Sequence, residues 1–314
     1  MTVITKKNEV YLKVTAEPHV HKELSEHFIF DVPGAKYMPQ YQKWKWDGKI
    51  RLYSPATGEI YAGLFDYVTD FLEEKGYDFS IEDSTYGRPD DWESIISPES
   101  VSGYVRSLGL PFKARDYQLR AIYQALRHHR KLLLSPTGSG KSLIIYAIVR
   151  WHLGFDRNIL IIVPTVSLVE QLAKDFRSYG WRTNDLHKIQ AGAEKYVESS
   201  VVISTWQSIY KEPRKFFKRF DVIIGDEAHL YKAKSLTSIL TKCRDAKYKV
   251  GLTGTLDGLE SHQLVLEGLF GRVDRVTKTI DLMEKGELTP LTVSYTHLRA
   301  HETLRYLVCR LLLE

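Results

Sequence analysis

The segment SPTGSGKS at residues 135–142 constrains this chain more than any other feature, because it lies between a short apolar run and a stretch of helical character. Gly138 and Gly140 let the backbone bend so that successive N–H groups point into one concavity, and the N-terminus of the following helix adds the positive end of its dipole. Such a loop binds phosphate when a strand enters it and a helix leaves it. The segment therefore predicts an α/β layer with a phosphate site at one edge.

Each residue type in this loop has an expected task. Lys141 would reach the β- and γ-phosphate oxygens, and the Ser142 hydroxyl would ligate Mg²⁺. The general pattern begins with glycine where this chain has Ser135, another small residue. A Gly/Ser loop without a ligand is the competing interpretation, which the strand–loop–helix context disfavours. The loop residues expected to bind ATP are Pro136, Thr137, Gly138, Ser139, Gly140, Lys141 and Ser142.

A second motif, DVIIGDEAHL at residues 221–230, is an apolar run that ends in two carboxylates. Asp226 at the strand end would join the magnesium shell, and Glu227 would orient and deprotonate the attacking water. An acidic helix cap after a strand is the alternative interpretation. A magnesium-type acid that follows a phosphate loop in the same chain favours nucleotide hydrolysis instead. The expected catalytic set is completed by His229, whose role is given below.

The remaining apolar runs predict how the chain is organised. Runs at 131–134, 158–163, 201–204, 222–225 and 248–253 alternate with helical segments, which is typical of a parallel sheet covered on both faces. Before them, strand-like segments and a helix ending at Gly76 indicate a smaller α/β unit. We expect a small domain at 1–82, a linker rich in Ser, Asp, Pro and Gly at 83–111, and the larger domain at 112–293.

Charge and cysteine usage narrow the partners and the compartment. Residues 1–110 carry 12 Lys/Arg against 18 Asp/Glu, whereas residues 111–293 carry 29 against 19, and a basic block suits a polyanionic partner. Cys243 and Cys309 lack paired spacing, which favours a reducing cytoplasm and disfavours a disulfide framework or structural zinc. No apolar run is long enough to span a bilayer, and the N-terminus has no secretory signal pattern.

The two motifs together resemble those of superfamily 2 helicases of the DEAH type, and further landmarks follow in the family's order. RDYQ resembles the adenine-reading motif, which implies nucleotide contacts from Arg115 and Gln118. LTGTL resembles motif III, which implies that Thr253 and Thr255 couple hydrolysis to strand movement with His229. VPTVSLVEQ and STWQS resemble motifs Ia and Ib. Their implied DNA contacts are Pro164, Thr165, Gln171, Thr205 and Gln207.

The resemblance implies a fold class as well: a RecA-like parallel sheet of the P-loop NTPase type, preceded by a small α/β N-terminal domain. Taken singly, each minor motif has a plainer interpretation, such as a polar helix start, a turn marked by Pro164, or caps at Thr205 and Thr253. The helicase interpretation is favoured because these motifs occur in the family's order along a single series of alternating strands and helices.

The segment PGAKYMPQYQKWKWDGKIRLY, residues 33–53, resembles the N-terminal domain of the UvsW family of bacteriophage recombination helicases. Lysines alternate with aromatic residues there, as suits phosphate contact and base stacking. We expect Lys43, Lys45 and Lys49 to form an auxiliary DNA contact. A hairpin whose aromatic side chains face its own core remains the alternative.

The expected activity is an ATP- and Mg²⁺-dependent DNA helicase or translocase. Motors of this superfamily use a second RecA-like domain, and no segment after Thr255 resembles its QxxGRxxR motif, so we expect that domain elsewhere in the full-length protein. Residues 294–314 resemble a translated sequencing adaptor and are expected not to be native; an amphipathic helix is the alternative. Other candidate functions are a non-catalytic DNA-binding module with a nucleotide site and the motor subunit of a restriction translocase.

Overall fold

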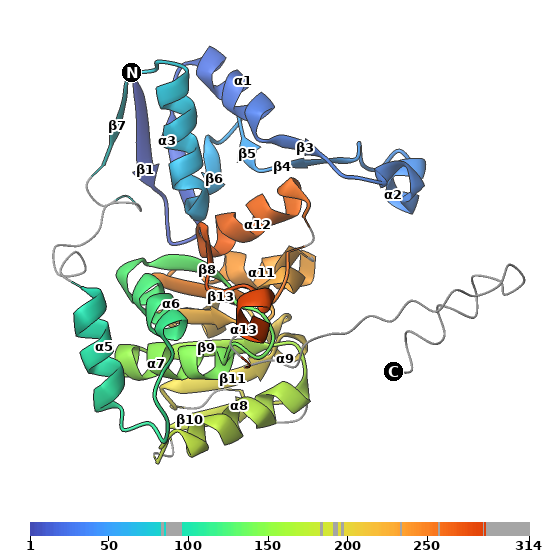
Figure 1. Ribbon diagram of the computed structural model, residues 1–314. Coiled ribbons are helices and arrows are strands. Elements are labelled where there is room, and N and C mark those ends of the chain that lie inside the picture. Colours follow the sequence, from blue (N-terminus) through green and yellow to red (C-terminus); the bar gives the residue numbers. More distant parts are fainter. Residues whose placement is uncertain are drawn as a thin grey trace, which may run out of the picture.

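The computed structural model describes residues 1–82, 85, 96–182, 185–190, 194, 195, 198–232, 234–256, 258–284 and 286. The expected tail at 294–314 and the first part of the expected linker lie outside them. Among these residues the chain forms a large sheet domain and a smaller N-terminal unit, which lies above it in Figure 1. No helix in this part of the chain combines the length and apolar character needed to cross a membrane.

Seven strands of the described residues form one sheet in the order β10-β11-β9-β12-β13-β8-β14, and every neighbouring pair is parallel. Alternate residues of a strand point to opposite faces. In β9, Ile159 and Ile161 therefore pack with the helices α6–α8, whereas Leu160 and Ile162 pack in a second core on the opposite face. The predicted parallel sheet, buried on both faces, is confirmed.

The first half of this domain begins with a helix inside the segment expected to be linker, and that helix packs against the next one. The domain boundaries themselves stay a prediction. The elements are α5 (Pro98–Ser107), α6 (Asp116–Arg127), β8 (Arg130–Leu134), α7 (Lys141–Leu153), β9 (Ile159–Val163), α8 (Val166–Ser178), β10 (Leu186–Ile189) and β11 (Val201–Thr205).

The second half of the domain supplies the remaining strands and the helices of the other face. Its elements are α9 (Trp206–Ile209), α10 (Arg214–Phe217), β12 (Val222–Gly225), η3 (Ala228–Lys232), α11 (Lys234–Lys242), β13 (Tyr248–Thr253), α12 (Glu260–Phe270), β14 (Val273–Arg275) and α13 (Thr279–Glu284).

In the N-terminal unit, a sheet of order β5-β6-β2-β1-β7 is covered by α1 and α3 (Figure 1). The expected helix forms as α3 and is followed by Gly76, whose φ of 70° suits a glycine after a helix. The elements are β1 (Thr2–Lys6), β2 (Tyr11–Thr15), α1 (Pro18–His27), β3 (Ile29–Asp31), η1 (Ala35–Tyr37), α2 (Pro39–Gln42), β4 (Lys49–Arg51), β5 (Tyr53–Ser54), β6 (Glu59–Tyr61), η2 (Ala62–Leu64), α3 (Phe65–Glu74) and β7 (Phe79–Ile81).

The N-terminal unit docks on the sheet domain through α12 at very short range. A Cβ atom placed on Gly63 would lie 2.0 Å from the backbone oxygen of Glu267 and 2.8 Å from that of Gly268. The Glu267 side chain is fully buried and accepts a hydrogen bond of 2.5 Å from the Tyr67 hydroxyl. Apolar residues of both units pack in one core. The two units therefore form one continuous packed body.

Two buried cations of the sheet domain hold the other side of this interface. Lys249 Nζ donates to the backbone oxygen of Glu9 at 2.5 Å, and Arg130 donates to the same oxygen and to that of Leu269. Both side chains are 1% exposed. Burial lowers the pKa of Lys249 well below its ordinary value. The loop at Glu9 is thus held by directional bonds to its main chain.

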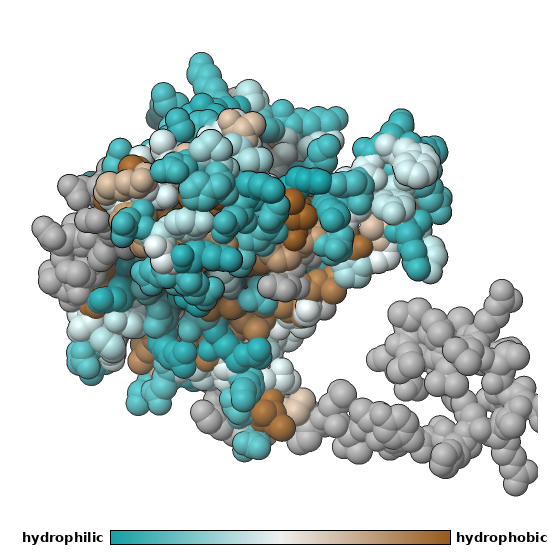
Figure 2. All heavy atoms as spheres, turned by 90° about the horizontal axis from the view of Figure 1, so that it is seen from above, coloured by the Kyte–Doolittle hydropathy of each residue, from teal (hydrophilic) through white to brown (hydrophobic). Residues whose placement is uncertain are grey.

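The ribbon of residues 29–51 projects from the N-terminal unit as an arm (Figure 1). Its base is the antiparallel pair β3–β4, in which Phe30 lies opposite Ile50. Its tip contains η1 and α2. In the space-filling view the arm stands out as a separate lobe with hydrophilic and intermediate colours (Figure 2). The arm therefore presents its surface to solvent on several sides.

Candidate functional site

The strands of the parallel sheet bring the predicted motifs to one edge. The phosphate loop follows β8, Asp226 follows β12, and Thr253 ends β13. Pro164 follows β9, and Thr205 ends β11. Because parallel strands all end at the same edge, motifs distant in sequence meet there, where open α/β sheets bind ligands.

The phosphate loop is held open by left-handed glycines and by two buried serines. Gly138 and Gly140 have φ values of 81° and 78°, which side chains other than glycine rarely adopt. Ser135 and Ser139 are fully buried, and their hydroxyl oxygens lie 2.6 Å apart. Ser139 also donates to the backbone oxygen of Pro136 at 2.6 Å. The serine at the first position thus braces the loop from inside.

Gln118 braces the loop from the side of α6. Its Nε2 donates to the backbone oxygen of Ser139 at 2.9 Å, and its Oε1 accepts from the backbone N–H of Arg115 at the same distance. The side chain is 5% exposed, and a Cβ on Gly140 would lie 2.3 Å from its Nε2. The structure therefore gives Gln118 a role in shaping the loop that the sequence did not predict. Its contact with a base stays a prediction.

Lys141 and Glu227 face each other across the site. Lys141 begins α7, and its Nζ lies 2.6 Å from Glu227 Oε1. Glu227 has a φ of 50°, in the left-handed region that is unfavourable for a long side chain. Backbone strain of this kind gathers at functional sites. Lys141 and Glu227 are therefore brought together, whereas their roles in phosphate binding and as a general base stay predictions.

Asp226 and Ser142 offer the oxygens that a magnesium ion would use. Burial raises the pKa of Asp226, and the nearby Lys141 charge opposes that effect. Asp226 Oδ1 is covered from solvent and has no hydrogen-bond partner among the described residues. The Ser142 hydroxyl lies 2.9 Å from the hydroxyl of Tyr179, at the end of α8. Since Mg²⁺ prefers hard oxygen ligands, an unpartnered carboxylate oxygen and a serine hydroxyl fit it.

A short polar chain joins Glu227 to the end of β13. His229 Nδ1 lies 3.3 Å from Glu227 Oε2 and 2.9 Å from the Thr253 hydroxyl. Thr253 in turn donates to the backbone oxygen of Thr255 at 2.9 Å. Because a hydroxyl has one proton, His229 must be the donor to Thr253, so Nδ1 carries hydrogen. The chain connects the carboxylate to the coupling residues predicted from the sequence.

Four of the five predicted DNA contacts on the sheet domain lie where β9 and β11 end, and the fifth, Gln171, lies within α8. Pro164 and Gln207 meet, because Gln207 Nε2 donates to the Pro164 backbone oxygen at 3.3 Å. Thr165 caps α8, and Gln171 is exposed on that helix. Thr205 is 4% exposed, and its hydroxyl lies 2.9 Å from that of Ser208. Thr205 is thus buried and supports its loop, and its contact with DNA stays a prediction.

The arm lysines are far from the nucleotide loop in sequence and lie on a separate projection. Lys43, Lys45 and Lys49 are all exposed. Lys49 Nζ lies 3.8 Å from Asp31 Oδ1, whereas no described carboxylate pairs with Lys43 or Lys45. The aromatic side chains divide between the two interpretations, since Trp44 is 95% exposed while Trp46 is half-buried.

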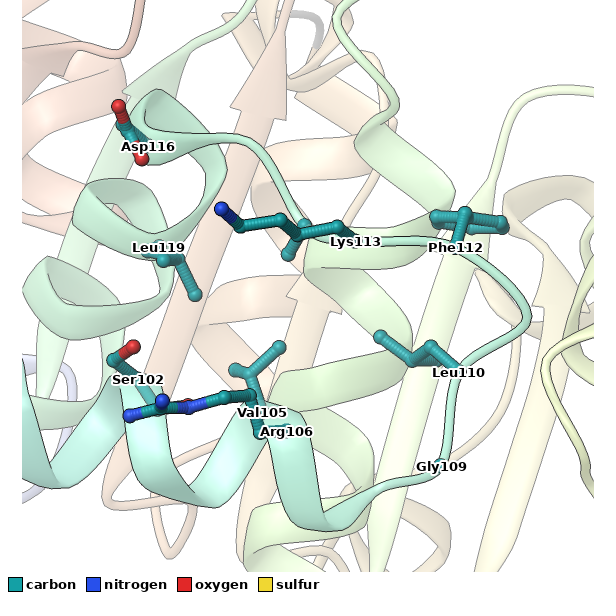
Figure 3. Close-up of a pocket in the computed structure, with 10 residues that line it drawn as sticks. Ser102, Val105, Arg106, Gly109, Leu110, Phe112, Lys113, Asp116 and Leu119 are labelled. Carbon is teal, nitrogen blue, oxygen red and sulfur yellow. The ribbon is translucent and has the colours of Figure 1, made fainter.

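The structure also adds groups that no sequence motif marked. Tyr179 reaches Ser142 from the end of another helix, and fully buried Tyr231 lies in the same small hollow as Asp226. A larger pocket of about 500 Å³ lies between α5 and the start of α6 (Figure 3). Lys113 extends toward its interior in that view. No phosphate-loop residue is among those lining it, so it is distinct from the nucleotide edge.

Comparison with known families divides the chain into the same two parts. The family described as "DNA helicase UvsW, N-terminal" matches residues 4–82. The family described as "Type III restriction enzyme, res subunit" matches residues 111–258. Each match falls within one structural unit.

Individual relatives match most of the chain or a part of it. The "ATP-dependent DNA helicase uvsW" of Enterobacteria phage T4 is 32% identical over 92% of this chain and 59% of its own length. The "DNA 3'-5' translocase XPB2" of Sulfurisphaera tokodaii is 30% identical over 45% of this chain and 30% of its own. A crystal structure of the T4 UvsW helicase aligns with a TM-score of 0.78 at 28% identity, over 87% of this chain and 99% of that one. The chain spans less than two thirds of the length of these curated relatives.

Proposed function

We propose a function from the premise that this chain belongs to the UvsW-like helicases of superfamily 2. In this proposal it is the ATP-binding, DNA-contacting portion of an ATP-driven DNA helicase or translocase that remodels recombination intermediates or forks. Action in the cytoplasm of the host cell stays a prediction.

One observation carries the proposal: Lys141, Asp226 and Glu227 meet at the carboxyl edge of the sheet. The contact of 2.6 Å between Lys141 and Glu227 joins the phosphate loop to the end of β12. The covered, unpartnered oxygen of Asp226 lies beside them, and the Lys141 charge lowers its pKa against the effect of burial. A site that only capped a helix would not need a lysine, a half-buried carboxylate and a strained glutamate together.

The residues suggest how the nucleotide would change the site. Lys141 has one charge, so phosphate oxygens that accept its N–H groups compete with Glu227 for it. Released from this ion pair, Glu227 could accept a proton from the attacking water. A change in the protonation or position of Glu227 would then affect Thr253 through His229, which contacts both residues. Asp226 and Ser142 would hold Mg²⁺, which neutralises charge on the phosphates when it is bound.

Two further elements of the proposal rest on relatives. Half-buried Pro164 and the exposed groups of Thr165, Gln171 and Gln207 would follow one DNA strand, with Lys43 and Lys45 as a second contact. A second RecA-like domain of the full-length protein would complete the nucleotide site. Arginines supplied in this way contribute about 10³–10⁵ in rate in related NTPases. The described chain is therefore expected to bind ATP and hydrolyse it slowly.

A restriction translocase is the second candidate, favoured by the description of the family that matches residues 111–258. The two candidates share the motor and differ in the N-terminal unit, whose match is to UvsW. A non-catalytic module with a nucleotide site is disfavoured, because Lys141, Asp226 and Glu227 are all present and in contact or adjacent.

The test compares the purified chain with its Lys141→Ala variant. Calorimetry should show Mg²⁺-dependent ATP binding that the variant loses, while Lys174→Ala, which removes an exposed lysine on α8, should bind ATP normally. Phosphate release should rise when DNA is added. Equal nucleotide affinity for the parent and the Lys141→Ala variant would refute the proposed site. Fast DNA-stimulated turnover by residues 1–293 alone would refute the need for a second domain.

A further inference from the structure

We propose that the tip of the arm is a stacking site for unpaired nucleobases, with the indole of Trp44 as its main platform. The proposal deepens the DNA-motor function and rests on it. It assigns the arm to single-stranded nucleic acid, such as the unpaired strand beside a branch point, whereas a general basic contact would bind any phosphate backbone.

The backbone at Trp44 is the first argument. Trp44 follows the C-terminal cap of α2, and the N–H groups of Trp44 and Lys45 donate to the backbone oxygens of Tyr41 and Gln40, both at 2.9 Å. This pair of bonds is the Schellman motif, whose left-handed position is usually glycine. Trp44 occupies that position with a φ of 56°. A bulky aromatic side chain there is unfavourable for folding, so its presence calls for another explanation.

Packing does not supply that explanation, because the side chain is 95% exposed. Tyr37 and Tyr41 are 73% and 41% exposed nearby. A shallow hollow of about 380 Å³ lies beside the indole, with Trp46 and Asp47 among its lining residues. Exposed rings gathered on one projection present faces on which planar groups can stack.

The tip is also held in shape before anything binds. A Cβ on Gly48 would lie 2.9 Å from Ala35 Cβ and 3.2 Å from the ring of Tyr41, so the two ends of the tip are in close contact. Trp46 Nε1 donates to the backbone oxygen of Lys49 at 2.9 Å, and Asp47 pairs with Arg51. Rings already fixed in place lose less freedom when a ligand binds.

Charge identifies the occupant. Residues 33–51 hold five Lys/Arg and one acidic residue, in an N-terminal region that is otherwise acidic. Lys43 and Lys45 flank Trp44, and Lys36 Nζ lies 5.1 Å from the centre of the Tyr37 ring. Alternating cations and rings suit a single strand, which offers phosphates and base faces together. A protein partner is less suited, because lysines are depleted at protein–protein interfaces. Paired bases hide their faces within the stack.

The experiment uses the full chain and three fluorescent DNA probes: a duplex with a single-stranded tail, the same duplex with a tail of abasic sites, and a blunt duplex. Trp44→Gly should bind the base-containing tail about 5- to 150-fold more weakly, the range expected for loss of one stacked base. Its affinity for the other two probes should match the parent. Since glycine suits the left-handed position, the variant should melt no lower than the parent. Trp44→Phe should keep most of the tail affinity.

Two comparisons separate this inference from the proposed DNA contact. Lys43→Gln with Lys45→Gln should weaken binding to all three probes and reduce the salt dependence. Phe155→Ala removes an exposed ring outside the arm and should change nothing. If the lysine variant weakens binding but Trp44→Gly does not, the stacking site is wrong and the basic contact stands. If neither variant weakens any probe, the arm has no role in DNA binding. Equal loss on base-containing and abasic tails by Trp44→Gly would also overturn the inference.

Discussion

Replacing Gly63 by alanine should loosen the docking of the N-terminal unit on the sheet domain. The added Cβ would lie 2.0 Å from the backbone oxygen of Glu267, whereas ordinary contact begins at 3.4 Å, so η2 and α12 must separate by about 1.4 Å. The atoms in the way belong to the main chain of α12 and cannot turn aside as a side chain would. Inserting a methyl group into such a contact costs about 1–3 kcal/mol.

Thermal denaturation followed by circular dichroism measures this cost. A loss of about 1–3 kcal/mol corresponds to a Tm lower by roughly 2–12 °C for a cooperative unit of a few hundred residues. Gly103→Ala is the matched control, because Gly103 lies in α5 with no atom within 4 Å of the new Cβ. Alanine in a helix is favoured over glycine by about 0.5–1 kcal/mol, so the control should melt slightly higher. If both variants melted alike, the close approach of η2 to α12 would be refuted.

Three further predictions concern buried polar groups. Because burial raises the pKa of Asp226, the folded chain disfavours the charged form of this carboxyl group. Asp226→Asn should therefore raise Tm at neutral pH. A pH series of thermal melts should show this gain vanish as the pH falls through the pKa of Asp226 in the folded chain toward its pKa in the unfolded chain. Burial lowers the pKa of His152 to about 3, so protonation of this residue in the unfolded chain below about pH 6.5 should destabilise the parent by up to about 1.4 kcal/mol per unit of pKa difference. In urea titrations, His152→Asn should reduce the fall in the free energy of unfolding with decreasing pH. An unchanged pH dependence would contradict the burial of His152. Gln118→Ala leaves two backbone groups unpaired and should cost about 1–3 kcal/mol and weaken ATP binding, whereas Gln124→Ala on the same helix should do neither in calorimetry.

The motor fold could be predicted from sequence because its signals are local. Continuous apolar runs mark strands buried on both faces, and β9, β12 and β13 formed where such runs stood. The phosphate loop and the residues after β12 meet because parallel strands share an edge, a rule that needs no knowledge of side-chain contacts. The edge strands β10 and β14 were not predicted, since short strands at a margin need less apolar character.

Contacts between distant segments could not be predicted in this way. Nothing in the run around Tyr179 marks it as a partner of Ser142, because that contact depends on where α8 ends. Burial of Thr205 likewise follows from the turn into α9, and a motif alone describes only residue types. The exposure of Trp44 could not be predicted either, since aromatic residues beside lysines suit either a hairpin core or an open surface.

The bonds that hold the loop at Glu9 have a consequence for sequence divergence. Arg130 and Lys249 recognise a backbone carbonyl, a group that all twenty residue types possess. Mutations at position 9 therefore keep these backbone bonds, but they remove the carboxylate that lies 3.6 Å from the buried Arg130 guanidinium. Because a buried cation that loses its partner is unfavourable, we expect an acidic residue at position 9 to be retained together with the long donors at positions 130 and 249.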